Sequence, residues 1–269
     1  MDATPVYPIT QRLTRDIDPI RQGRQVWLAI VVPVIGSAIA TGVFTFSGLY
    51  PQIAVGPAFA LLAVLILLIT LGIASSILTY HEAHDESFRL LLMTTLPNLA
   101  IVEGMRVGIY ARTKPIRTAI NSLLISFVVM PIIANFVLYA VNPFFGLESA
   151  IEITLFSVVG GLLAVIVMWG TTVLFADFAI KVGIAAALRL RSEGQFASTV
   201  VTFVIVATSE APVLICTVLT LVDVGRGAIT VFVALFSMVV TFFVMSLAGR
   251  PMVEQTIYRT LQRERRAAT

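Results

Sequence analysis

One glutamate stands alone in a long apolar stretch of the sequence. Glu210 lies in segment 197–221, where Thr208-Ser209 precede it and Ala211-Pro212 follow it. A charge at the centre of a bilayer costs at least about 2.5–3.5 kcal/mol on insertion scales, so such a residue is expected to line a path or to have partners. Pro212 removes a backbone donor and predicts a broken helix here. Ser209 and Glu210 are therefore candidates for a translocation path or a re-entrant turn; the alternative is a glutamate satisfied by neighbouring helices.

An acid and a base also lie together near the end of an earlier apolar run. Asp177 and Lys181 are spaced i, i+4 with the acid first, the favourable order for an ion pair on a helix. They follow directly on the apolar run that begins near Ile153. We predict a surface ion pair at the inner headgroup level, where the fourth membrane span ends, and retain both residues as further candidates for a translocation path.

Motifs for catalysis or metal binding are incomplete. His81-Glu82-Ala83-His84 is one residue shorter than the His-Glu-x-x-His zinc motif, and the chain has only two histidines. Neither a phosphate-binding Gly-x-x-x-x-Gly-Lys-Ser/Thr loop nor a Gly-x-Ser-x-Gly nucleophile turn occurs. We therefore expect no catalytic residue, metal or cofactor on this chain.

A polar segment, residues 80–117, separates two apolar runs and carries charged residues throughout. Its apolar residues recur at helical spacing on both sides of Pro97, which predicts two amphipathic helices at the membrane surface, with Asn98 as the N-cap of the second. The apolar positions are Phe88, Leu91 and Leu92 before the break, and Val102, Met105 and Ile109 after it. We interpret the segment as the binding site of a soluble partner; the alternative is a connecting loop that lies on the headgroups.

Transmembrane helices are the elements that must position these residues. The 269 residues are 58% hydrophobic and only 12% charged, about half the charge of soluble domains. Several apolar runs are long enough to cross a bilayer, and the alternation typical of barrel strands is absent. Cys216 is the single cysteine and excludes an intramolecular disulfide. We predict an all-α polytopic bundle with six spans, at about 26–46, 54–79, 118–141, 152–176, 197–221 and 227–248.

The ends of the chain differ from this membrane domain, residues 26–248. Residues 1–25 are polar, and an apolar stripe from Ile9 to Ile20 predicts an amphipathic helix in the headgroup region. No cleavable signal peptide is visible before the first span. Residues 249–269 form a basic tail.

The basic residues determine the predicted orientation. Seventeen of the 18 Lys and Arg residues fall in the two ends and in the loops after the second and fourth spans, and only Arg226 falls on the other side. The positive-inside rule then places both ends and residues 80–117 in the cytoplasm. The net charge of +3 thus reflects topology and does not indicate nucleic-acid binding.

Taken together, these residues resemble the type-2 ATP-binding-cassette exporter permeases over most of the chain. The matching elements are an elbow helix at Pro8 to Trp27, an acidic cluster at Glu82, Asp85 and Glu86, a leucine run at Leu90 to Leu92, a Thr95-Leu96-Pro97 turn, Ile101-Val102-Glu103-Gly104, and the small residues Val182 to Leu188. The sequence also departs from the family. Met105 and Arg106 follow Gly104 where a lysine is expected, and the family's paired re-entrant helices would have to fit into Thr208 to Val222.

The resemblance implies a permease of the plasma (inner) membrane that pairs with a second permease copy or a paralogue. It further implies a separate ATPase subunit that binds ATP and Mg and docks on the inner face, so that this chain is not itself an enzyme. The implied docking contacts are Glu86, Arg89, Thr95, Pro97 and Asn98. An alternative is a non-transporting accessory or scaffold subunit of a respiratory or photosynthetic membrane complex.

Overall fold

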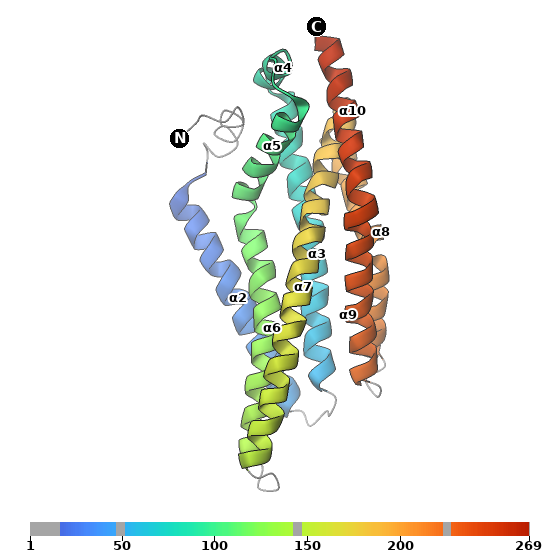
Figure 1. Cartoon of the computed structure of the whole chain (residues 1–269). Helices are drawn as coiled ribbons and strands as arrows, with labels where there is room; N and C mark the ends of the chain where they lie inside the picture. Colours follow the sequence, from blue (N-terminus) through green and yellow to red (C-terminus); the bar gives the residue numbers. More distant parts are fainter. Residues whose placement is uncertain (1–16, 47–51, 142–146, 223–226, 269) are drawn as a thin grey trace.

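The computed structural model describes residues 17–46, 52–141, 147–222 and 227–268, which are helical apart from short turns (Figure 1). Apolar, helix-favouring stretches form the long elements, and turns fall where polar residues, proline or glycine interrupt them. In chain order the helices are α2 (Pro19–Phe46), α3 (Gln52–His84), α4 (Glu86–Leu92), α5 (Asn98–Arg112), α6 (Lys114–Val141), α7 (Leu147–Arg189), α8 (Gln195–Val222), α9 (Gly227–Val244), the π-helical η2 (Met245–Gly249) and α10 (Arg250–Ala268).

Five helical segments of this described part are long and apolar enough to cross a membrane, as expected for a multi-pass helical membrane protein. They are Pro19–Ile39, Leu62–His84, Met168–Arg189, Gln195–Cys216 and Phe236–Ala267. Each overlaps one of the predicted spans. The remaining predicted span, 118–141, coincides with α6, of which many side chains lie outside the described residues.

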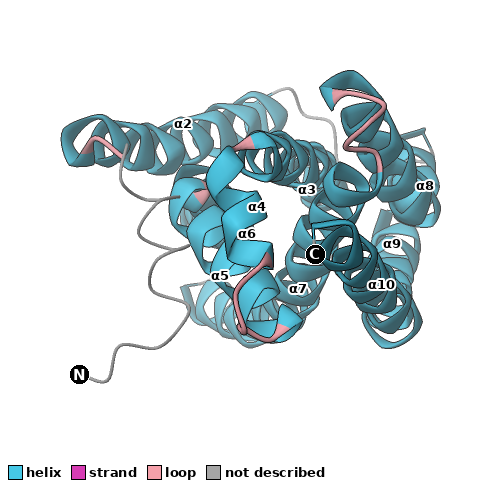
Figure 2. Ribbon diagram, turned by 90° about the horizontal axis from the view of Figure 1, so that it is seen from above, coloured by secondary structure: helices cyan, strands magenta, loops and turns pink. Residues whose placement is uncertain are grey.

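Helix α3 occupies the middle of the bundle. It packs against α2, α6, α7, α8 and α9, and α2 lies at the periphery beside α6 (Figure 2). The start of α2, the α4–α5 segment and the C-terminal end of α10 lie at the same end of the molecule (Figure 1). This arrangement brings the segments that contain most of the basic residues to one face.

Several helices continue beyond the predicted spans. α7 has 43 residues, about 65 Å at 1.5 Å per residue, roughly twice the thickness of the hydrocarbon core. The helix thus continues beyond residue 176, where the fourth span was predicted to end, as far as Arg189. The stretch Val182 to Leu188 is not a loop but part of α7 and is buried. A short turn that includes Gly194, with φ of +102°, then reverses the chain into α8.

The C-terminal segment, described from the sequence as a basic tail, is helical. α9, η2 and α10 follow one another without a break, and α10 packs on α7, α4 and α5. Its side chains Ile257 and Leu261 are 1% and 0% exposed. The basic residues of 249–269 thus lie on an amphipathic helix whose apolar face belongs to the protein core.

Only part of the predicted elbow helix can be compared. Residues 1–16 lie outside the described residues, as does most of the stripe from Ile9 to Ile20. Residues 19–25 are the first part of α2, which continues without a break into the predicted first span, 26–46.

The polar segment 80–117 contains the two predicted helices, α4 and α5, separated at residues 93–97. Asn98, however, is not the N-cap: Pro97 occupies that position with extended backbone, and no side chain caps the helix. The apolar faces are buried in the protein, with Phe88 2% and Met105 1% exposed, rather than turned to the headgroups. α5 leads almost directly into α6 through Thr113 (Figure 1).

Candidate functional site

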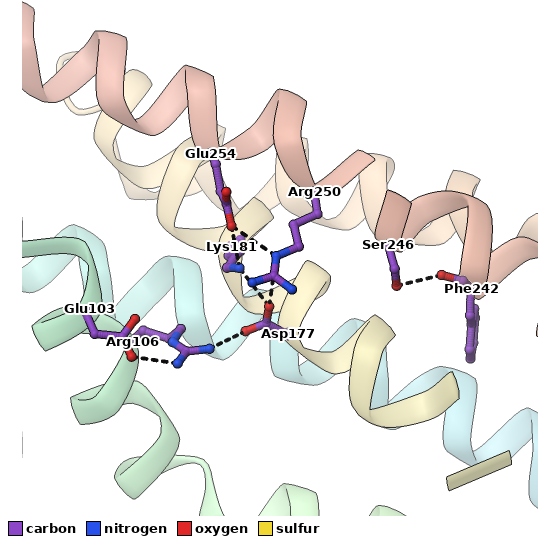
Figure 3. A network of polar contacts seen from close by, with 8 residues as sticks. All are labelled: Glu103, Arg106, Asp177, Lys181, Phe242, Ser246, Arg250 and Glu254. Atoms are coloured by element: carbon purple, nitrogen blue, oxygen red, sulfur yellow. Dashed lines mark hydrogen bonds and ion pairs between the residues drawn. The ribbon is translucent and has the colours of Figure 1, made fainter. Parts of the chain in front are cut away.

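An ion-pair network joins three helices that are far apart in the sequence (Figure 3). Arg106 of α5 donates hydrogen bonds to Glu103, at 2.6 Å, and to Asp177 of α7, at 3.0 Å. Lys181 Nζ lies 2.8 Å from Asp177 Oδ2 and 2.7 Å from Glu254 Oε1 of α10. Arg250 completes the network. It donates to Glu254 at 3.1 Å and lies 3.8 Å from Asp177. Charged contacts therefore connect α5 to α7 and α10.

The centre of this network is buried, which corrects the prediction of a surface ion pair. The side chains of Lys181 and Asp177 are 5% and 11% exposed. The acid–base pairing predicted from their i, i+4 spacing is confirmed, but the partners Arg106 and Glu254 were not foreseen. The sequence does show that each of these residues has an oppositely charged residue at helical spacing: Glu103 and Arg106 are i, i+3, and Arg250 and Glu254 are i, i+4.

Arg106 remains charged in this network. The hydrogen bond to Glu103 is the main factor that raises the pKa of Arg106 above its ordinary value, and the contact with Asp177 adds to this effect, whereas burial opposes it. This permanent positive charge forms charge-assisted hydrogen bonds with the two carboxylates that Arg106 contacts, Glu103 and Asp177.

The network lies just beyond the ends of two predicted spans, 152–176 and 227–248. α9 and η2 contribute 18 and 5 residues before Arg250, about 35 Å at 1.5 Å per residue and long enough to cross the ~30 Å hydrocarbon core. The charges are surrounded by protein and link α5 to α7 and α10.

Just beside the network, α3, α7 and α8 approach one another through small residues. A Cβ atom on Gly183 of α7 would lie 2.5 Å from the Gly72 carbonyl oxygen and 2.8 Å from the Ser76 nitrogen of α3. Ser76 also donates a hydrogen bond to Ser198 of α8, at 3.2 Å. In lipid such backbone contacts carry helix association, because apolar burial alone gives little net gain.

Replacing Gly183 by alanine should therefore lower the free energy of unfolding by about 1–3 kcal/mol, since the new methyl group meets backbone atoms that cannot move aside. Unfolding of the purified chain in mixed detergent micelles measures the change. Gly170→Ala on the same helix is the matched control, because nothing lies within 4 Å of a Cβ there and alanine favours the helix. Equal stability of the two variants would contradict the close approach.

Glu210 lies on the buried face of α8 and is 2% exposed. The predicted helix break is wrong: α8 runs from Gln195 to Val222 with Pro212 inside it, so the region holds no pair of re-entrant helices. Neither carboxyl oxygen of Glu210 has a hydrogen-bond partner among the described residues. Ser209, 6% exposed, donates to the Val206 carbonyl of its own helix and not to Glu210. The described residues therefore do not support the alternative, in which neighbouring helices supply hydrogen bonds to the Glu210 carboxyl group.

The packing of α3 against α8 defines what surrounds this glutamate. The two helices are antiparallel, with Ser76 opposite Ser198 and Gly72 against Thr202 and Val206. Glu210 lies about one turn beyond Val206 on α8 and therefore at the level of apolar residues of α3. These are Val64, Leu65 and Leu68, each at most 2% exposed.

The implied docking residues lie at the α4–α5 tip, away from Glu210. Glu86, Arg89, Thr95 and Pro97 are exposed, and Asn98 is half-buried, with no hydrogen-bond partner for its Oδ1 among the described residues. The tip also exposes apolar side chains, which a soluble partner could cover. These are Leu90 (65% exposed), Met93 (49%) and Leu99 (62%).

The tip is anchored to the C-terminal helix. Arg265 of α10 donates a hydrogen bond of 2.5 Å to the Leu96 carbonyl oxygen, in the turn between α4 and α5. Arg191, at the α7–α8 turn, forms an ion pair of 3.1 Å with Glu264 of α10. α10 thus contacts both the turn beside the candidate docking residues and the ion-pair network, whereas Ser209 and Glu210 lie on α8.

The two histidines lie at the end of α3. His84 Nδ1 is 2.9 Å from the Tyr80 carbonyl oxygen, and the His84 and Tyr80 rings are 4.1 Å apart. Among the residues described, no group of three or more His, Cys, Asp or Glu side chains could hold a metal ion.

Comparison with known proteins identifies no relative: no family model matches the sequence, and neither a curated protein nor a solved structure matches it significantly.

Proposed function

We propose that this chain is the membrane-spanning permease subunit of an ATP-driven exporter. The observation that supports this best is the combination of an exposed α4–α5 tip with a charged connection from α5 into the bundle. Glu86 and Arg89 lie on the exposed side of this tip. Arg106 connects α5 to Asp177 and, through Lys181, to α10. A soluble motor bound at the tip could pull on the spanning helices through these contacts.

The proposed topology has six spans in the plasma (inner) membrane, with both termini and the α4–α5 tip in the cytoplasm. α6 supplies the third span and has 28 residues, enough to cross the hydrocarbon core. The distribution of Lys and Arg supports this orientation. A second permease copy or paralogue would complete the membrane part.

In this proposal the chain binds neither ATP nor Mg, which belong to the separate ATPase subunit. Closure of the ATPase dimer would displace α4 and α5. The close contact of α7 with α3 at Gly183 makes a rigid-body tilt of these helices the expected response. Ser209 and Glu210 on α8 remain candidates for the substrate path.

A second candidate is a non-transporting accessory or scaffold subunit. The unbroken helix α8 favours it, because no re-entrant element lines a path in the described residues of this helix. Asp177 and Lys181 also pair with each other, which leaves their charged groups less able to bind a substrate.

Affinity purification of the intact chain in a mild detergent should recover an ATP-binding subunit together with the chain. The amount recovered should fall when Leu90 and Leu99 at the tip are both replaced by serine, because these exposed apolar residues would lose their contact with the partner. Leu247→Ser on η2, also 62% exposed, is the control and should leave the recovery unchanged. Recovery of redox subunits without an ATPase would instead establish the scaffold function.

A further inference from the structure

Glu210 differs from the other residues of the spans predicted from the sequence. Apart from Glu152 at the very end of its span, it is the only acidic or basic residue in the six predicted spans. It lies near the middle of the span 197–221 and on the buried face of α8. A carboxyl group within an apolar span is costly to bury, so we take it to indicate a function that depends on its chemistry.

Among the described residues, none donates a hydrogen bond to the Glu210 carboxyl group. The facing residues of α3 are apolar, and neither α9 nor residues 153–176 of α7 contain a titratable side chain. Cys216 is the only other titratable residue of α8. The nearest charges, Asp177 and Lys181, lie further along α7 and already pair with each other.

An ionised carboxylate without a partner is therefore incompatible with this packing, whereas the neutral acid is compatible with it. We propose that Glu210 is a proton-binding site of the membrane interior, protonated while α3 and α8 are in contact and deprotonated when they separate. On separation water enters, the carboxyl O–H bond breaks, and the proton passes to that water. By linkage, a higher pH favours the separated helices.

This site would make the opening of the bundle sensitive to protons. The inference rests only on the packing of α8 against α3 and on the unpartnered carboxyl group, so it holds for an exporter and for a scaffold alike. Its test needs no ATPase subunit, and a failed pull-down would leave it intact.

Ser76 and Ser198 provide a reporter of helix contact, because their Oγ atoms are 3.2 Å apart. Ser76→Cys and Ser198→Cys are introduced into the full chain, with Cys216→Ser so that no other thiol is present. The protein is placed in lipid nanodiscs and oxidised with membrane-permeant iodine between about pH 6 and about pH 9. The same cysteine pair with Glu210→Gln is the matched control for the pH dependence of the thiols themselves.

The cross-linking rate, divided by that of the Glu210→Gln control at each pH, should fall at least about threefold as the pH rises, because ionisation of Glu210 separates the helices. A ratio that stays constant over the whole range would overturn the proposal. Glu210→Gln retains the size of the side chain and mimics the neutral acid, so the control is expected to fold.

Labelling with dicyclohexylcarbodiimide gives an independent measurement, since this apolar reagent modifies carboxyl groups in their protonated form. At about pH 7 the Glu210 peptide should carry the adduct, which mass spectrometry detects, whereas carboxylates in water are ionised. Ser209→Ala should retain the adduct and Glu210→Gln should lose it. An adduct only below about pH 5, or none at any pH, would identify Glu210 as an ordinary or inaccessible carboxylate and refute the proposal.

Discussion

Replacement of Asp177 by asparagine should lower the free energy of unfolding by about 3 kcal/mol. Asp177 is the acid shared by Lys181 and Arg106, and the Lys181 side chain is only 5% exposed. Removing one partner of a buried ion pair typically costs about 3–5 kcal/mol, because an uncompensated charge remains. The lower end applies here, since Lys181 keeps its contact with Glu254.

Unfolding of the purified chain in mixed detergent micelles measures this loss. Glu264→Gln is the matched control: it neutralises an acid in the partly exposed Arg191–Glu264 pair and should cost less than about 1 kcal/mol. The double variant Asp177→Asn, Lys181→Gln should be more stable than Asp177→Asn alone, because it also removes the buried Lys181 charge, which has lost one of its two acidic partners, and the pairs Arg106–Glu103 and Arg250–Glu254 persist. Equal losses for Asp177→Asn and Glu264→Gln would argue against a buried network.

Exchanging the charges of Glu86 and Arg89 should abolish the ATPase activity that depends on the permease in a reconstituted complex. Both side chains are exposed on α4, where the proposed motor subunit docks. Like charges would then face each other across the interface and would weaken both docking and its coupling to α5. Stability should change by no more than about 0.5 kcal/mol, because exposed side chains contribute little to folding.

The measurement compares ATP hydrolysis by the complex with that by the ATPase subunit alone. Arg259→Glu, an exposed charge change on the neighbouring helix α10, is the control and should preserve the permease-dependent activity. Unchanged coupling in the variant Glu86→Arg, Arg89→Glu would remove these two residues from the interface and leave the scaffold function as the better explanation.

The membrane-spanning character and the helical class follow from the sequence because they depend on local properties. Apolar runs of bilayer length, such as 54–79, can satisfy their backbone in lipid only as helices. The two short helices around Pro97 are likewise local, since proline lacks the donor that a continuing helix needs. The same reasoning failed at Pro212, where packing of α8 against α3 and α9 keeps the helix unbroken.

The ends of the helices could not be placed in this way. Hydropathy falls after residue 176, yet α7 continues to Arg189 because its polar residues find partners on other helices. Likewise, 249–269 reads as a basic tail, but Ile257 and Leu261 form an apolar face that α10 buries against the bundle.

The sequence by itself determined which residues carry charge within or beside the membrane: Glu210, and the pair Asp177 and Lys181 with its helical spacing. Only the tertiary structure decided what these charges meet. Lys181 gained Glu254, and Asp177 gained Arg106, from segments more than 70 residues away in the sequence, whereas Glu210 gained no hydrogen-bond partner among the described residues. The reason is physical: charge and hydropathy are properties of a residue and its near neighbours, but desolvation and pairing depend on which helices pack together.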